Sequence, residues 1–168
     1  LWENPEVTSI NKLPPRATFT SFGSRDDSSG DNPTLSHHVQ ALNGTWDFRL
    51  DPAGEGRDQG WFNADVPYPD TIQAPGNWQA QGFGEPRRHL RHDYQGKAWY
   101  RRNVTVPGDW AGRRIWVHLG GTSNTAVVYV NGKRVGQVEG FQARASMTRA
   151  PPTPRTISWQ RRISRPRT

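Results

Sequence analysis

Polar side chains that could take part in chemistry gather between Arg87 and Tyr94. Two histidines, His89 and His92, lie there beside Asp93, and imidazole and carboxylate groups bind metals or transfer protons. Their spacing matches no metal motif, and the other histidines of the chain show none either. We therefore predict no metal site and interpret the histidines as surface or structural residues. The alternative is a small ligand cluster of His89, His92 and Asp93.

The acids are scattered along the chain, and no pair can be assigned as a general acid and a general base from sequence alone. Those considered are Asp47, Asp51, Asp65, Asp70 and Asp93. The chain also lacks a nucleophile elbow, a phosphate-binding loop and a dinucleotide-binding fingerprint. We therefore predict no catalytic residue and no cofactor in this chain.

An aromatic ring is the leading candidate for ligand binding. Trp78 ends the turn Pro75-Gly76-Asn77-Trp78 and leads into a long connection over residues 79–96. An indole exposed at this position would stack on the ring of a bound ligand. The alternative is that Trp78 is a buried anchor for the connection, since most of the eight tryptophans are expected to fill a core.

The elements that position these side chains are short strands. Three runs of β-branched and aromatic residues have the composition of strands. They span residues 99–106, 115–119 and 125–130. Asn131-Gly132 follows the last run and supplies the two positive φ angles of a type I′ hairpin turn. In the first run, Arg101, Asn103 and Thr105 share one face because side chains alternate along a strand.

A further turn and strand precede them at residues 41–50. Trp46, Phe48 and Leu50 alternate with polar residues there, so they are predicted to lie on one buried face. Nothing in the chain has both the period and the length of a helix. Short strands at regular spacing, separated by turns, indicate an antiparallel all-β sandwich or jelly roll.

The net charge of +7 comes from the C-terminal end of the chain. Residues 144–168 contain seven arginines and no acid, whereas residues 1–143 contain 15 basic and 15 acidic residues. The tail also has too little apolar surface to order itself. We therefore divide the chain into an extended N-terminal arm and loop (1–36), a β-sandwich (37–143) and a disordered or aberrant tail (144–168). The sandwich is predicted to be incomplete at its C-terminal end.

The amino-acid composition limits the cellular compartments and the binding partners that we expect. The absence of cysteine excludes disulfides and thiolate metal sites. No apolar stretch approaches the length of a membrane-spanning helix, and no signal peptide is visible, so we expect a cytoplasmic protein without a membrane partner. Nonspecific binding of nucleic acid by the arginine-rich tail is an alternative function, because arginines neutralise phosphates. Nucleic acid is nevertheless not the partner we expect.

Five motifs in order resemble the N-terminal sugar-binding domain of glycoside hydrolase family 2, particularly its β-galactosidase branch. They are Trp2-Glu3-Asn4-Pro5 with Ile10 to Ala17, Leu42 to Phe48, Pro75 to Gln79, Trp99 to Arg102, and Val130 to Gly136. Each motif alone is weak, but the five occur in the expected order over a stretch of about 140 residues. A free-standing carbohydrate-binding module is the alternative reading of the same likeness.

The resemblance implies a jelly-roll sandwich at the head of a multidomain retaining β-glycosidase. In that family the two carboxylates that break the bond lie on a separate TIM barrel, so the present chain is predicted to be inactive alone. The missing downstream domains and, weakly, a β-galactoside-like carbohydrate are the expected partners. A loop that lends polar side chains to the substrate in some members falls here at Arg91 to Tyr94. Tyr94 matches the family residue at this loop, so the resemblance implies Tyr94 and its neighbour Asp93 as substrate-binding residues, in addition to the Trp78 ring considered above.

The tail departs from the family pattern. Members continue past the hairpin with a Phe-x-Phe-Asp-type strand and then an apolar strand, where this chain has Arg144 to Arg149. With suitable codons, Ser146-Met147-Thr148 reads Phe-Asp-Asp in the neighbouring frame. We therefore interpret the chain as a truncated family member whose tail is out of frame, a hypothesis that the nucleotide sequence tests.

Overall fold

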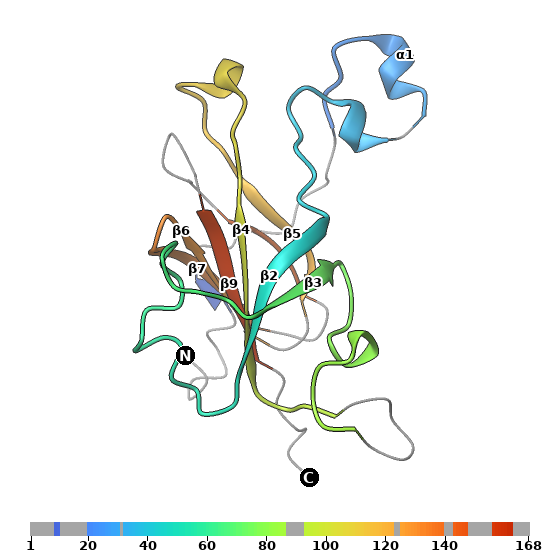
Figure 1. Cartoon of the computed structure of the whole chain (residues 1–168). Coiled ribbons are helices and arrows are strands. Elements are labelled where there is room, and N and C mark those ends of the chain that lie inside the picture. The colour runs from blue at the N-terminus through green and yellow to red at the C-terminus, as the bar shows by residue number, and fades with distance from the viewer. Residues whose placement is uncertain are drawn as a thin grey trace.

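The computed structural model describes residues 9–10, 20–30, 32–86, 93–122, 125–139, 143–147 and 156–162. Strands dominate it, and the predicted all-β class is confirmed (Figure 1). The strands are β1 (Ser9–Ile10), β2 (Gly44–Asp51), β3 (Asp70–Ala74), β4 (Lys97–Asn103), β5 (Val117–Thr122), β6 (Thr125–Val130), β7 (Lys133–Glu139), β8 (Ala143–Met147) and β9 (Thr156–Arg162).

The helical elements are a single turn or less. They are α1 (Arg25–Ser28), η1 (Pro33–Leu35), η2 (Gln79–Gln81) and η3 (Gly108–Trp110). Within the described ranges, no helix has the length and apolar content needed to cross a membrane. In Figure 1, α1 and η3 lie at the upper end of the molecule, whereas η2 lies lower, beside β3.

The strands form two antiparallel sheets. The larger has seven strands in the order β1-β7-β6-β9-β4-β2-β3, and the smaller pairs β5 with β8. The hairpin between β6 and β7 confirms the predicted turn, since Asn131 and Gly132 have φ angles of 49° and 74°. Val130 pairs with Lys133, which leaves a loop of these two residues.

The seven-stranded sheet is buried on both faces. On one face, Trp46, Phe48 and Tyr100 join a cluster that also includes Ile72 and Trp78, while Leu50 packs against it as the alternation predicted. On the other face, Trp99 and Tyr129 pack with Trp61, from the loop that joins β2 to β3. Because successive residues of a strand point to opposite faces, neighbours such as Trp99 and Tyr100 belong to different clusters.

The C-terminal part of the chain forms strands, contrary to expectation. The prediction of a disordered tail over residues 144–168 is wrong for 144–147 in β8 and for 156–162 in β9, while 148–155 and 163–168 lie outside the described residues. β9 pairs with β4 on one side and β6 on the other. Main-chain pairing with both neighbours orders this segment, and its Thr156, Ile157 and Trp159 are residue types that favour strands.

The predicted N-terminal arm is described only in part. Ser9 and Ile10 form β1, which pairs with Val138 and Gln137 of β7, so the arm is extended at this point. The motif Trp2-Glu3-Asn4-Pro5 and residues 11–19 lie outside the described residues. The later part of the predicted arm and loop (1–36) contains the two short turns α1 and η1.

Candidate functional site

The long connection after β3 begins with a compact turn. The Ala74–Pro75 peptide bond is cis. The Asn77 side chain accepts a hydrogen bond from the backbone N–H of Gln79 at 2.9 Å, which starts η2. Gly82 ends η2 with a φ of 92°, and Phe83 N–H then donates to the Trp78 carbonyl at 3.0 Å. These local contacts turn the chain back over the sheet.

The Trp78 indole is fully buried, with an exposed fraction of 0 %. Its ring lies 6.3 Å from that of Phe48 and 5.8 Å from that of Tyr94, the latter in an edge-on arrangement. The prediction of an exposed stacking ring at Trp78 is therefore wrong. The alternative reading is right, because the turn directs the indole into the core and makes it the anchor of the connection.

The turn also closes the outer edge of the large sheet. The Gln81 side chain accepts from the Gln73 N–H and donates to the Gln73 carbonyl, both at 2.9 Å. β3 is the last strand of the sheet, and these bonds satisfy two main-chain groups that its open edge would otherwise present. The Gln73 side chain in turn donates to Thr45 on β2 at 2.8 Å.

Asp93 and Tyr94 lie at the base of the connection, where it returns to the sheet. Asp93 forms a two-way backbone bridge with Glu85, with N–H···O distances of 2.8 and 2.9 Å. Gly84 has a φ of +114°, and a Cβ there would lie 2.7 Å from the Asp93 carbonyl oxygen. Glycine is therefore required at position 84, where the segment that contains Glu85 meets the segment that contains Asp93. Arg87 to His92, including His89, lie outside the described residues.

The Tyr94 side chain is half-buried and has a structural partner. Its hydroxyl donates to the Lys97 carbonyl at 2.7 Å, and burial raises its pKa to about 12. The structure therefore places Trp78, Asp93 and Tyr94 together at the base of the long connection. The Trp78 and Tyr94 rings are in contact, and Asp93, next to Tyr94 in the sequence, is half-buried. Of these three side chains, Asp93 alone carries a carboxylate, a group that accepts hydrogen bonds from hydroxyls.

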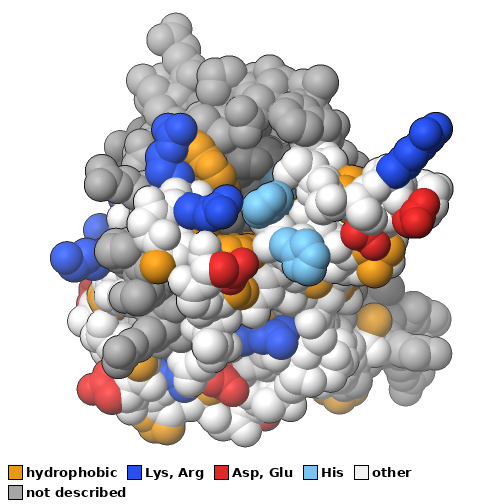
Figure 2. Space-filling model, turned by 90° about the horizontal axis from the view of Figure 1, so that it is seen from above, with side chains coloured by type: hydrophobic (Ala, Val, Ile, Leu, Met, Phe, Trp, Pro, Cys, Tyr) orange, Lys and Arg blue, Asp and Glu red, His pale blue; other side chains and the backbone are white. Residues whose placement is uncertain are grey.

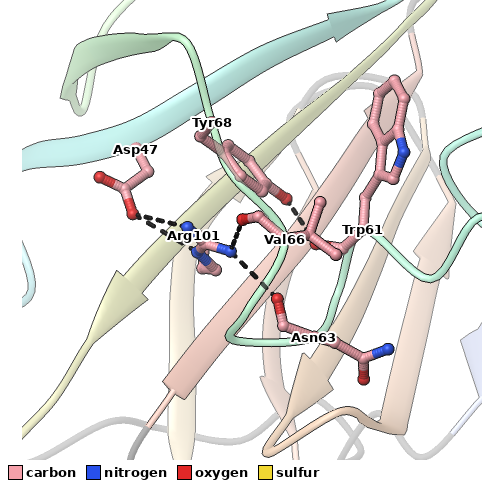
Figure 3. Close-up of polar contacts among 6 residues, drawn as sticks. All are labelled: Asp47, Trp61, Asn63, Val66, Tyr68 and Arg101. Carbon is pink, nitrogen blue, oxygen red and sulfur yellow. Dashed lines mark hydrogen bonds and ion pairs between the residues drawn. The ribbon is translucent and has the colours of Figure 1, made fainter.

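Two charged residues that the sequence analysis left without a role organise the opposite face of the sheet. Arg101 is only 8 % exposed, under the loop between β2 and β3 (Figure 3). Its guanidinium donates to the carbonyls of Asn63, at 3.0 Å, and Val66, and pairs with Asp47 at 3.3 Å. Its centre also lies 4.2 Å from the centre of the Tyr68 ring.

The ring of Tyr68 completes this arrangement. Burial raises the pKa of Tyr68, while the nearby Arg101 and Arg49 oppose that shift. The hydroxyl stays neutral and donates to the Trp61 carbonyl at 2.9 Å. The alternation of β4 correctly placed Arg101 opposite Tyr100, but it could not reveal that a loop covers that face.

Asp51 is the second such residue, with an exposed fraction of 1 %. Its Oδ2 accepts from the Trp99 indole N–H at 3.0 Å and from the Gly56 N–H at 3.1 Å. A Cβ at Gly56 would lie 2.2 Å from the indole nitrogen, so only glycine fits. The sequence signal was an acid that ends a strand just before a glycine-rich loop. The Asp51 carboxylate fixes that loop against the sheet by accepting from the Gly56 N–H.

No group of three or more metal-ligating side chains occurs in the parts of the chain that the structure describes. His37, His38 and His118 are described and do not form one, whereas His89 and His92 are not described. The ligand cluster weighed at His89, His92 and Asp93 thus falls mostly outside the described residues.

Comparison with known proteins gives a match for most of this fold. Residues 39–148 match the family described as glycosyl hydrolases family 2, sugar binding domain. Solved structures of a β-glucuronidase from Ruminococcus gnavus are similar. Its complex with D-glucaro 1,5-lactone has 25 % identity and a TM-score of 0.64. Its complex with uronic isofagomine has 26 % identity and a TM-score of 0.63. Each alignment covers 74 % of this chain but only 21 % of the solved chain.

Proposed function

Since this chain belongs to the sugar-binding domains of glycosyl hydrolases family 2, we propose that it is the carbohydrate-recognition part of a β-glycosidase and is not itself catalytic. The match over residues 39–148 carries the proposal. The chain spans about a fifth of the length of the solved proteins that it matches. The cleavage of the glycosidic bond is therefore assigned to other parts of such a protein.

The base formed by Glu85 and Asp93 is the proposed point of contact with the sugar. The backbone bridge joins Glu85 to Asp93, and the buried Trp78 ring packs against the Tyr94 ring beside it. A rigid base lowers the entropic cost of ordering polar side chains around a ligand. Asp93 then accepts hydrogen bonds from sugar hydroxyls. The next residue, Tyr94, is held in place because its hydroxyl donates to the Lys97 carbonyl.

We propose a terminal β-galactoside as the sugar. The sequence motifs that resemble the β-galactosidase branch support this choice. A β-glucuronide is the second candidate, because the similar solved structures cited above are β-glucuronidases. A glucuronide carries a carboxylate, which Asp93 would repel, whereas a galactoside carries only hydroxyls.

Binding of methyl β-galactoside to the purified chain tests the role of Asp93. We expect weak binding, in the millimolar range typical of a few hydrogen bonds, and a loss of at least about tenfold in Asp93→Ala. The Glu85 bridge uses main-chain atoms only, so this change leaves the base in place. Affinity is measured by following NMR line shifts during titration with the sugar, with methyl β-glucuronide titrated in parallel.

Asp109→Ala is the matched control, because this exposed acid lies in η3 at the other end of the molecule (Figure 1). Its affinity should equal that of the unchanged chain. Equal affinity in Asp93→Ala would contradict the role of Asp93. Tighter binding of the glucuronide than of the galactoside would contradict the choice of sugar, and the absence of binding to either would contradict sugar contact by this chain.

The chain alone is expected to hydrolyse neither nitrophenyl β-galactoside nor nitrophenyl β-glucuronide. A retaining glycosidase needs two carboxyl groups about 5–5.5 Å apart and facing the substrate. Here the Asp51 carboxylate is buried against Trp99, and that of Asp47 is paired with Arg101. Release of nitrophenolate is measured with protein made in a host that lacks both enzymes. Turnover that co-purifies with the chain would contradict this assignment.

A further inference from the structure

The outer edge of β3 is where the seven-stranded sheet ends in the part of the chain that the structure describes. An edge strand presents N–H and C=O groups that pair readily with another strand, including the same strand of a second copy. The side chains agree with a position at the surface, because Thr71 and Gln73 are both exposed. How this edge avoids pairing with a second copy is therefore a question that its contacts can answer.

Two residues of β3 direct their main-chain groups away from β2. Gln73 is one, because its N–H and its C=O both bond to the Gln81 side chain. Successive residues of an antiparallel pair alternate between facing the neighbouring strand and facing away, so Thr71 is the other. The positions that continue this alternation are Pro69 and Pro75, which have no N–H. The part of the edge that can both donate and accept is limited to Thr71 and Gln73.

A second copy of the chain fits this short edge. Antiparallel pairing of two β3 edges about a two-fold axis places Thr71 opposite Gln73 of the second copy, and these residues would exchange hydrogen bonds. The same register places Asp70 opposite Ala74, so no two like charges face each other across the axis. Side-chain charge therefore does not prevent β3 from pairing with itself.

The Gln81 side chain occupies the place that such a strand would take. Its amide accepts from the Gln73 N–H and donates to the Gln73 carbonyl, both at 2.9 Å, as a residue of a neighbouring strand would do. Gly76 provides the room for this amide. A Cβ at Gly76 would lie 2.4 Å from Gln81 Nε2 and 2.7 Å from the Gln73 carbonyl oxygen, so the arrangement needs glycine there.

We propose that this contact is autoinhibitory: the Gln81 amide, seated over Gly76, keeps the β3 edge from pairing with the β3 edge of a second copy. While the contact is made, Thr71 alone offers an outward N–H, and one residue is too short a template for a strand. Loss of the contact adds Gln73 and completes the template. Neither Gln81 nor Gly76 is among the residues proposed to contact a sugar, so this inference does not depend on that proposal.

Removal of the Gln81 amide tests the proposal. Gln81→Ala should raise the self-association constant of the full chain at least about tenfold, because hydrogen bonds are gained on both sides of the two-fold axis. Sedimentation equilibrium at several protein concentrations measures this constant. Amide hydrogen exchange gives the location of the contact. In Gln81→Ala the Gln73 amide should exchange faster than in the unchanged chain at low concentration, and it should slow again, together with Thr71, at high concentration.

Gln79→Ala is the matched control, because it removes the same kind of side chain from the same short helix, η2. The Gln79 side chain reaches the Tyr94 carbonyl and not β3, so association should stay unchanged. Thr71→Pro, added to Gln81→Ala, removes the other outward N–H and should return the chain to a monomer. Circular dichroism checks that each variant is folded.

Self-association through apolar side chains is a different process, and the same measurements separate it. Leu35, Val39 and Trp116 are the exposed large apolar side chains of the described chain. Figure 2, which views the molecule from above, shows apolar side chains beside histidine and basic ones. A dimer formed through such contacts would leave the exchange of the Thr71 and Gln73 amides unchanged.

Four results would overturn the proposal. They are equal association of Gln81→Ala and the unchanged chain, an equal gain in Gln79→Ala, a Gln81→Ala dimer that does not slow exchange at Gln73, and a dimer that persists when Thr71→Pro is added.

Discussion

Trp78→Ala is expected to destabilise the domain by about 3–5 kcal/mol, the usual cost of removing a buried tryptophan ring from a core. The indole has no exposed surface and touches Phe48 from the sheet and Tyr94 from the returning chain. Its loss leaves a cavity where the long connection packs against β2. The free energy of unfolding is measured in guanidinium chloride by far-ultraviolet circular dichroism.

The contrast with Trp116 makes this result diagnostic. Trp116 is 38 % exposed and comes directly before β5, so Trp116→Ala should cost less than about 1 kcal/mol. Similar losses in the two variants would contradict the assignment of Trp78 as the anchor. Trp78→Phe should recover part of the loss, because a smaller ring still fills part of the space.

Arg101→Met is the second large effect, with an expected loss of about 2–4 kcal/mol. Methionine retains the apolar stem but leaves the part-buried carbonyls of Asn63 and Val66 without their donor, at up to about 1–3 kcal/mol for each. The ion pair adds little, since the Asp47 side chain is 45 % exposed and therefore screened by water. Urea unfolding of the two proteins side by side gives the difference in free energy.

Two further variants locate the origin of that loss. Asp47→Asn removes only the exposed partner and should cost less than about 1 kcal/mol. Arg57→Met removes an exposed arginine from the same loop and should change stability very little. A loss in Asp47→Asn as large as that in Arg101→Met would mean that the ion pair, and not the carbonyl contacts, holds the loop on the sheet.

Local sequence patterns were sufficient for the strands that carry their own signal. Asn131-Gly132 predicted its hairpin turn, and the alternation of Trp46, Phe48 and Leu50 predicted their shared face, since both depend on neighbouring residues only. The burial of Trp78 could not be predicted in this way. Its environment comes from Phe48 and Tyr94, which lie 30 and 16 residues away in the sequence.

Contacts between residues distant in the sequence also explain the other differences between the predicted and the observed structure. β9 lies between β4 and β6, and the sequence of the segment itself gave no sign of this pairing. Arg101 was expected on a polar face because it alternates with Tyr100, yet the loop carrying Asn63 and Val66 covers it. Of the proposed site, the sequence placed Asp93 and Tyr94 in one loop, but it gave no sign of the backbone bridge to Glu85.

The place of β9 in the sheet has a consequence for biosynthesis. Although it is the last strand in the part of the chain that the structure describes, β9 separates β1-β7-β6 from β4-β2-β3 in the sheet. During translation these two groups emerge from the ribosome early, each with one edge awaiting its neighbour. The two groups of strands can join only after Arg162 has left the exit tunnel. Until then the nascent chain carries two unpaired strand edges, which are prone to aggregate. A chaperone that shields extended segments would therefore act at this stage, before the final strand closes the gap.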